Sequence, residues 1–308
     1  NRYGKMKFDL GINTGFAVNR FCEPKELFHF IKNGLKLNKV QLSADLLSPY
    51  LDKKILKSQT KKYKKEIKKN SVDITSIFTG AFTRLNHLAH SDKEIQRYWI
   101  KWFKSLVNIS SELECDTIGS HFGIFSYKDD NNFKLRKIRR QQNIENWHII
   151  ADYARKKGIK DILWEPMSIS REQGETINAC KKLQKDVNYK SPLPFKLCID
   201  VDHGELTSNN KKDIDPYFWL KTFAKDLKAV HLKQSYQDKG GHWPFIKKYN
   251  IKGKIMPDKV INTLIQNGCE KADLVLELSF RERNPIDKDA LKNIKKSVEY
   301  WRKNKKIN

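Results

Sequence analysis

The chain has 308 residues, of which 39% are hydrophobic and 11% aromatic, a composition that excludes a disordered protein and suffices for a buried core. No apolar run reaches the roughly 18 residues of a membrane span, and the first residues lack the apolar stretch of a signal peptide, so we expect a cytoplasmic protein with no membrane partner. The formal net charge of +25 raises nucleic acid as a partner, but the excess lysines are dispersed over presumptive helix faces such as residues 61–69. Dispersed lysines favour solvated helix surfaces, and we therefore expect no nucleic-acid partner.

The cysteines are odd in number, widely spaced and without a C-x-x-C pair: Cys22, Cys115, Cys180, Cys198 and Cys269. This pattern is typical of reduced core thiols in a cytosolic protein rather than of a disulfide framework or a zinc site.

Short apolar runs typical of strands alternate along the chain with longer stretches of helical periodicity. The predicted strands are residues 7–12, 39–43, 73–78, 116–122, 161–166, 195–200, 229–234 and 273–279. The predicted helices, one after each strand, are residues 23–37, 52–70, 93–113, 138–157, 172–186, 216–226, 257–267 and 287–303.

Eight alternating units without a break in composition predict an α/β protein with one domain, residues 1–308, folded as a single (β/α)8 TIM barrel. An open doubly wound sheet is the alternative. It would suit a Gly-rich phosphate loop after the first strand, and residues 11–17, GINTGFA, do not match G-x-G-x-x-G.

Each of the last four predicted strands carries one metal-competent side chain near its carboxyl end: Glu165, Asp200, His231 and Glu277. A single glutamate there usually caps a helix or pairs in a loop, and a lone histidine in an apolar strand is usually a hydrogen-bonded core residue. Because the carboxyl ends of barrel strands meet at one face, four such residues at matching positions favour one divalent metal site. This mixed oxygen and nitrogen set suits Mn²⁺, Co²⁺, Mg²⁺ or Zn²⁺.

The alternation of side chains in the stretch LCIDVDHG (197–204) supports this site. If Leu197 and Ile199 face the helices, Cys198 and Asp200 face the barrel axis. By the same alternation Lys233 shares the inward direction of His231.

These residues carry a family resemblance. The strings WEP (164–166), D-x-x-H (200–203), VHLK (230–233) and LELSF (276–280) resemble the xylose-isomerase-like sugar isomerase/epimerase superfamily, and their order is similar to that of D-tagatose 3-epimerase-type enzymes. Residues 78–90, 119–125, 164–177, 233–245 and 277–285 resemble the tetrulose-phosphate branch, of the D-erythrulose 1-phosphate 3-epimerase type. The resemblance covers nearly the whole chain.

The resemblance implies a role for each matching position. Glu165, Asp200, His231 and Glu277 match the metal ligands, Glu165 and Glu277 also match the two acid/base carboxylates, and His203 matches a substrate-binding histidine. The implied cofactor is one divalent ion, with Mn²⁺ favoured. The full set of predicted substrate-binding residues is His203, His121, Arg171, Lys233, Gln234, His242, Trp243 and Arg281.

Arg171 departs from the pattern of neutral-sugar epimerases, which carry a glutamate at this position. The planar guanidinium of an arginine suits a phosphate, which favours a phosphorylated ketose. The alternative is that Arg171 pairs with Glu172 or Glu175 at the start of a helix. Arg84, Lys233, Arg281 and Arg283 are further phosphate candidates, and residues 240–245, GGHWPF, offer His242 and Trp243 as a lid.

The predicted reaction is C3 epimerisation of a small ketose or ketose phosphate through a cis-enediolate, with one glutamate removing the proton and the other returning it to the opposite face. An aldose–ketose isomerase with the same site, an apurinic-site endonuclease and a non-catalytic sugar-binding barrel are the alternatives. The sequence leaves the sugar, the native metal and the oligomeric state open, and a homodimer is one such state.

Overall fold

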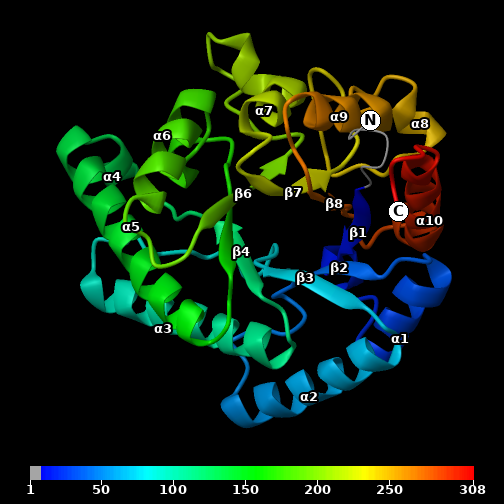
Figure 1. Cartoon of the computed structure of the whole chain (residues 1–308), viewed down its shortest axis with the longest axis horizontal. Helices are drawn as coiled ribbons and strands as arrows, with labels where there is room; N and C mark the ends of the chain where they lie inside the picture. Colours follow the sequence, from blue (N-terminus) through cyan, green and yellow to red (C-terminus); the bar gives the residue numbers. More distant parts are fainter. Residues whose placement is uncertain (1–7) are drawn as a thin grey trace.

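The strands form a closed parallel barrel in chain order, with β8 paired to β1, in the computed structural model, which describes residues 8–308 (Figure 1). The strands are β1 (Asp9–Asn13), β2 (Lys39–Ser43), β3 (Asp73–Phe78), β4 (Thr117–His121), β5 (Asp161–Glu165), β6 (Phe195–Asp200), β7 (Leu227–Leu232) and β8 (Asp273–Leu276). The predicted (β/α)8 TIM barrel is thereby confirmed. Residue 7 of the first predicted strand lies outside the described residues.

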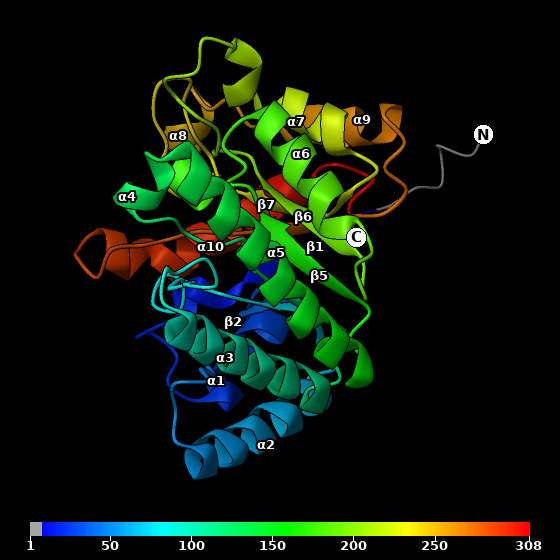
Figure 2. The ribbon, with the colours of Figure 1, turned by 90° about the vertical axis from the view of Figure 1, so that its left-hand side faces the viewer.

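Helices surround the strands on all sides (Figures 1 and 2). The longer ones are α1 (Pro24–His29), α2 (Lys53–Lys69), α3 (Lys93–Glu112), α5 (Phe133–Lys156), α6 (Ile177–Asn188), α7 (Pro216–Phe223), α9 (Pro257–Gln266) and α10 (Ile286–Arg302). Shorter ones are η2 (Thr14–Ala17), η3 (Phe30–Gly34), α4 (Tyr127–Asp130), η4 (Ser170–Glu172), η5 (Lys211–Ile214) and α8 (Lys247–Asn250). Among residues 8–308, no helix is long and apolar enough to cross a membrane.

The boundaries differ from the predictions where local capping decides them. The helix predicted at 138–157 begins at Phe133, because the Asn132 side chain accepts a hydrogen bond from the Leu135 amide and caps it. The strand predicted at 273–279 ends at Leu276, so Glu277 lies in the loop that follows. The cysteines are free, and four are buried as expected, whereas Cys22 is exposed.

A small apolar layer fills the inside of the barrel directly beneath the predicted ligands. It consists of Phe78, Leu163, Cys198, Ala229 and Val275. The last four each precede one predicted metal ligand by two positions, so alternation turns the ligands toward the same axis, one layer higher. Leu197 and Ile199 belong instead to the core between strands and helices, which confirms the predicted alternation.

We expect the Asp273→Asn substitution to stabilise the fold at high pH. Burial raises the pKa of Asp273 to about 6, although the positive charges of Lys228 and Lys271 act in the opposite direction. A raised folded pKa means that the native state loses stability as the pH rises from the ordinary aspartate value through 6. Because Asp273 is only half-buried, the free energy of unfolding of the Asp273→Asn protein should exceed that of the parent protein by about 1–2 kcal/mol at pH 8 and by near zero at pH 4.

Urea unfolding at both pH values measures this gain. Asp116 is the matched control, because burial would raise its pKa but the Lys160 ammonium lowers it. Because the Asp116→Asn protein lacks this stabilising charge, it should be less stable than the parent protein, and this deficit should not shrink as the pH rises from 4 to 8. A difference between Asp273→Asn and the parent protein that does not grow with pH would contradict the account.

Candidate active site

The four predicted metal ligands meet at the carboxyl end of the barrel. His231 Nδ1 lies 2.5 Å from Glu165 Oε2 and 3.0 Å from Glu277 Oε2. The possible ligand atoms of Asp200, His231 and Glu277 all lie within 4.8 Å of one another, as do those of Glu165, Asp200 and His203. Strand ends that lie far apart in the sequence thus offer one convergent group of donors.

This donor set fits a divalent ion. Three carboxylates and one imidazole are suited to Mn²⁺ and to chemically similar divalent ions. Glu165 and Glu277 also line a cavity above the barrel, which leaves one side of the site open for a substrate.

Gln41, which sequence reasoning missed, orients the His231 ring. Gln41 Oε1 accepts a hydrogen bond from Asn13 Nδ2 at 2.7 Å and lies 2.6 Å from His231 Nε2, and Gln41 Nε2 donates to Ser76 Oγ at 3.1 Å. Because Gln41 Oε1 can only accept, His231 Nε2 must carry a proton. His231 Nδ1 therefore faces the carboxylates as the atom that would bind a metal. A polar glutamine at an inward position of the apolar run KVQLS was the available signal.

We expect the Gln41→Leu substitution to weaken Mn²⁺ binding by about 10–100-fold, the usual effect of losing a partner of a metal-bound histidine. Calorimetric titration of the metal-free protein measures it. Gln184→Leu is the matched control, because Gln184 bonds to Trp164 Nε1 and the Phe195 carbonyl from α6, on the outside of the barrel. Equal Mn²⁺ affinities in Gln41→Leu and the parent protein would remove Gln41 from the site.

The carboxylates of Asp200 and Glu277 are charged although burial opposes it. Burial by itself would raise the pKa of Asp200, but His203 and Lys233 outweigh it and hold that pKa at about 2. Burial also opposes charge on Glu277, yet His231 and Lys233 lower its pKa well below the usual range. For His231, burial alone would lower the pKa, but the Cys198 sulfur and the carboxylates of Glu277 and Glu165 raise it. The group is therefore a compact cluster of opposite charges.

Lys233 belongs to this cluster. Its Nζ lies 2.5 Å from Asp200 Oδ2 and 2.6 Å from Glu277 Oε1, and its side chain is 1% exposed. The inward direction predicted for Lys233 is confirmed. Its ammonium contacts two of the predicted ligands rather than the cavity.

A cavity of about 420 Å³ opens above the cluster and is lined mainly by the loops that follow β1, β3 and β8. The predicted substrate-binding residues that line it are His121, His203, His242 and Arg281, and Arg84 and Arg20 line it as well. His242 Nδ1 lies 3.3 Å from Glu277 Oε1, and His203 Nδ1 donates to the Pro166 carbonyl at 3.0 Å. Burial, with Arg84 and His87 nearby, lowers the pKa of His121 to about 3, so this ring is neutral at physiological pH.

The other predicted substrate-binding residues do not line this cavity. The Arg171 guanidinium lies over the Tyr127 ring at 4.5 Å and donates to the Phe125 carbonyl. Within residues 8–308 Arg171 makes no ion pair with Glu172 or Glu175, so the alternative reading of Arg171 is wrong as well; Glu172 pairs with Arg84 from the loop after β3.

Gln234 and Trp243 hold the long loop after β7 in place. The side-chain amide of Gln234 donates to the Ile255 carbonyl and to Asn250 Oδ1, both at 3.0 Å. The Trp243 ring stacks on the Tyr249 ring with 4.9 Å between the ring centres, and the Trp243 carbonyl accepts a hydrogen bond from the backbone N–H of Gln234. This anchoring leaves His242 as the residue of the predicted lid that reaches the site.

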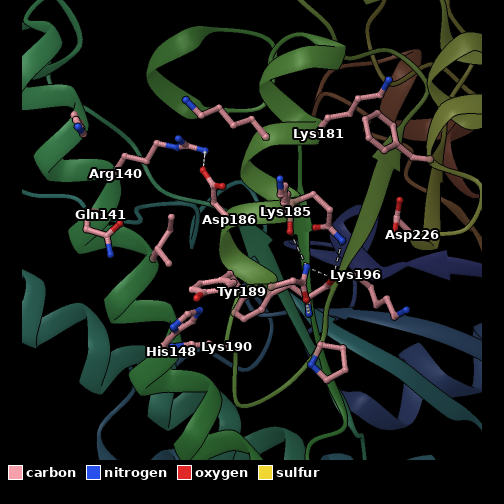
Figure 3. A pocket seen from close by; sticks show the side chains of 18 of the residues that line it. Arg140, Gln141, His148, Lys181, Lys185, Asp186, Tyr189, Lys190, Lys196 and Asp226 are labelled. Atoms are coloured by element: carbon pink, nitrogen blue, oxygen red, sulfur yellow. Dashed lines mark hydrogen bonds and ion pairs between the residues drawn. The ribbon is translucent and has the colours of Figure 1, made fainter.

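A larger hollow of about 1400 Å³ lies away from these residues and is lined by α5 and α6 (Figure 3). Figure 2 shows these two helices on the outside of the barrel. Its lining is basic, with Lys181, Lys182 and Lys185 on α6, and its Arg140 pairs with Asp186 at 2.9 Å. The lysines therefore gather more here than their dispersal along the sequence indicated. The hollow contains none of the predicted ligands or acid/base residues, so the smaller cavity is the candidate active site.

Comparisons with known proteins agree with this geometry. Residues 37–304 match the family described as xylose isomerase-like TIM barrel. The D-erythrulose 1-phosphate 3-epimerase of Brucella abortus (strain 2308) is 37% identical over 297 residues, which cover 96% of each chain. Among solved structures, a putative xylose isomerase from Rhodospirillum rubrum has a TM-score of 0.87 at 23% identity, over 97% of this chain and 99% of that one. D-psicose 3-epimerase from Clostridium cellulolyticum H10 has a TM-score of 0.69 at 15% identity, with the same coverage.

Proposed function

We propose that this chain, which belongs to the xylose isomerase-like TIM barrel family and is an enzyme of the isomerase class, is a divalent-metal-dependent 3-epimerase of a ketose phosphate. A tetrulose phosphate is the favoured substrate, because the relative from Brucella abortus carries the name of an epimerase of D-erythrulose 1-phosphate. The volume of the cavity, about 420 Å³, suits a small sugar.

The observation that carries the proposal is the convergence of Glu165 and Glu277. Glu165 ends β5 and Glu277 directly follows β8; they lie 2.5 and 3.0 Å from the same His231 atom, and both line the cavity. Epimerisation requires one base to remove the C3 proton from one face of the sugar and an acid to deliver a proton to the other. Two carboxyl groups that reach one cavity from different strands can supply these two proton transfers.

The remaining residues have supporting roles. A divalent ion, when bound, would polarise the ketone and stabilise the enediolate charge. The uncharged His121 ring can donate or accept a hydrogen bond at a sugar hydroxyl, and His203 and His242 lie beside Asp200 and Glu277, where they can orient the reacting carbons.

The phosphate group would lie at the cationic rim of the cavity, beside Arg281 and Arg84, rather than at Arg171. Arg20 also lines the cavity, but it is held by Asp287 at 2.7 Å and by the carbonyls of Phe16 and Phe280. Arg281 is exposed and makes no ion pair with any residue from 8 to 308. It is therefore the guanidinium most available to an anionic substrate.

We expect Arg281→Gln to raise KM for a ketose phosphate by about 10–100-fold, the effect of losing a hydrogen bond to a charged group. The KM for the same ketose without phosphate should hardly change. Arg283→Gln is the matched control, because Arg283 is an exposed arginine of the same loop that does not line the cavity. If both variants lowered turnover of both sugars alike, the phosphate would bind elsewhere.

Product analysis by NMR, with tetrulose, pentulose and hexulose phosphates and their unphosphorylated forms, tests the proposed function. An aldose–ketose isomerase would yield a product whose carbonyl has moved. An apurinic-site endonuclease would nick abasic plasmid DNA, and we expect no such cleavage, because the basic hollow lies along α5 and α6 rather than at the barrel mouth.

A further inference from the structure

Lys233 occupies an unusual position for a lysine. It follows β7 two residues after His231, and its ammonium lies between the carboxylates of Asp200 and Glu277. The Asp200 side chain is 0% exposed, and Lys233 itself 1%. Within residues 8–308 these two carboxylates are the hydrogen-bond partners of its ammonium. A lysine buried this deeply is stable only when its charge is compensated, so its charge and those of the carboxylates depend on each other.

A substrate-binding role explains this position poorly. Lys233 does not line the cavity where Glu165, Glu277 and His203 meet the solvent. Its ammonium already donates to two carboxylates, and a phosphate near it would also lie near those negative charges. Arg84 and Arg281 at the rim offer an anion less repulsion.

The charge count suggests a different role. Glu165, Asp200 and Glu277 together contribute −3 when ionised, and a divalent ion reduces the sum to −1. The Lys233 ammonium brings the loaded site to zero. When one of these glutamates takes the proton from the substrate, its own charge is neutralised. The enediolate charge then forms beside a cluster of net charge +1, rather than the zero it would be without Lys233, which a site of low dielectric favours.

We infer that Lys233 is a positioning residue that holds Asp200 and Glu277 in place before the metal binds and limits how tightly the ion is held. This inference rests on the proposed metal dependence but not on the identity of the sugar. Two effects of opposite sign follow from it. Removing the ammonium should destabilise the metal-free protein and, by removing a positive charge next to the ion, strengthen metal binding.

The test compares Lys233→Met with Lys228→Met. Lys228 lies on β7, at the end of the strand opposite to Lys233, and is ion-paired to Asp161 at 2.7 Å. Thermal unfolding of the EDTA-treated proteins and calorimetric titration with Mn²⁺ provide the measurements, and neither requires a known substrate. Lys233→Gln is a second neutral variant that can still hydrogen-bond to the carboxylates if the methionine variant fails to fold.

We expect the neutral Lys233 variants to unfold at a lower temperature than the parent protein without metal. Adding Mn²⁺ should raise their unfolding temperature by more than it raises that of the parent protein, because they should bind Mn²⁺ at least about 10-fold more tightly. Lys233→Arg, which keeps the charge, should restore an affinity near that of the parent. Lys228→Met should lower the unfolding temperature and leave Mn²⁺ affinity unchanged. Unchanged or weaker Mn²⁺ binding in the neutral Lys233 variants would overturn the inference, whereas failure of all sugars to react would count only against the proposed function.

If the epimerase activity is present, the kinetics give an independent measurement. The neutral variants should lower kcat by more than 10-fold with a smaller change in KM, because the lost charge matters most when the enediolate forms. A rise in KM at constant kcat would instead identify Lys233 as a substrate-binding residue.

Discussion

Replacing either Glu165 or Glu277 with glutamine should reduce epimerisation by at least about 10³-fold, because each variant loses one of two groups that must exchange protons with the substrate. Both residues line the cavity and converge on His231 Nδ1. Substrate binding should survive in both variants. Steady-state rates measured beside Mn²⁺ titrations separate lost proton transfer from lost metal, since both side chains are also predicted ligands.

The two variants should also differ from each other. Each retains one carboxylate, so each can still exchange the C3 hydrogen with D₂O in one substrate epimer only. Glu165→Gln and Glu277→Gln should therefore prefer opposite epimers. Equal exchange from both epimers in one variant would mean that a single base serves both faces, and the mechanism with two bases would be wrong.

The Asp200→Ala substitution should abolish activity by removing the metal, with Mn²⁺ affinity falling at least about 100-fold. This carboxylate is fully buried, has a pKa of about 2 because His203 and Lys233 outweigh burial, and offers no group for proton transfer at the cavity surface. Its loss also leaves the Lys233 ammonium with Glu277 alone. Metal content after dialysis and calorimetric titration measure the effect.

Asp202→Ala is the control for this prediction. Asp202 is two residues further along the chain, in the loop after β6, and its carboxylate lies 3.6 Å from Lys254 rather than beside His231. It should retain both metal and activity. Unchanged metal content in the Asp200→Ala protein would remove Asp200 from the ligand set.

The barrel and the convergence of its strand ends could be predicted because both follow from local periodicity. Alternation along a strand has a period of two, so one correctly placed apolar residue, such as Cys198, fixes the direction of Asp200. The same rule applied to Ala229 orients His231 and Lys233. Because the strands of a barrel surround one axis, side chains that point inward converge on that axis, whatever conformation the loops adopt.

The partners of these side chains could not be predicted, because they depend on loops and on neighbouring strands. Gln41 reaches His231 across 190 positions of sequence. Arg171 was expected at a phosphate, but the loop after β5 turns its guanidinium onto Tyr127, while Arg84 from the loop after β3 pairs with Glu172. Tertiary packing determines these side-chain contacts, and the spacing of residues along the chain does not predict them.

Glu165 and Glu277 should act on opposite faces of one bound ketose phosphate, and NMR of the Mn²⁺-loaded enzyme with D-erythrulose 1-phosphate in D₂O measures where the proton is lost and regained. Proton removal by one glutamate and delivery by the other should give the C3 epimer with one deuterium at C3. A sugar whose carbonyl has moved, deuterium at a different carbon, or an epimer that keeps the original proton at C3 would mean that the two glutamates do not act in this way.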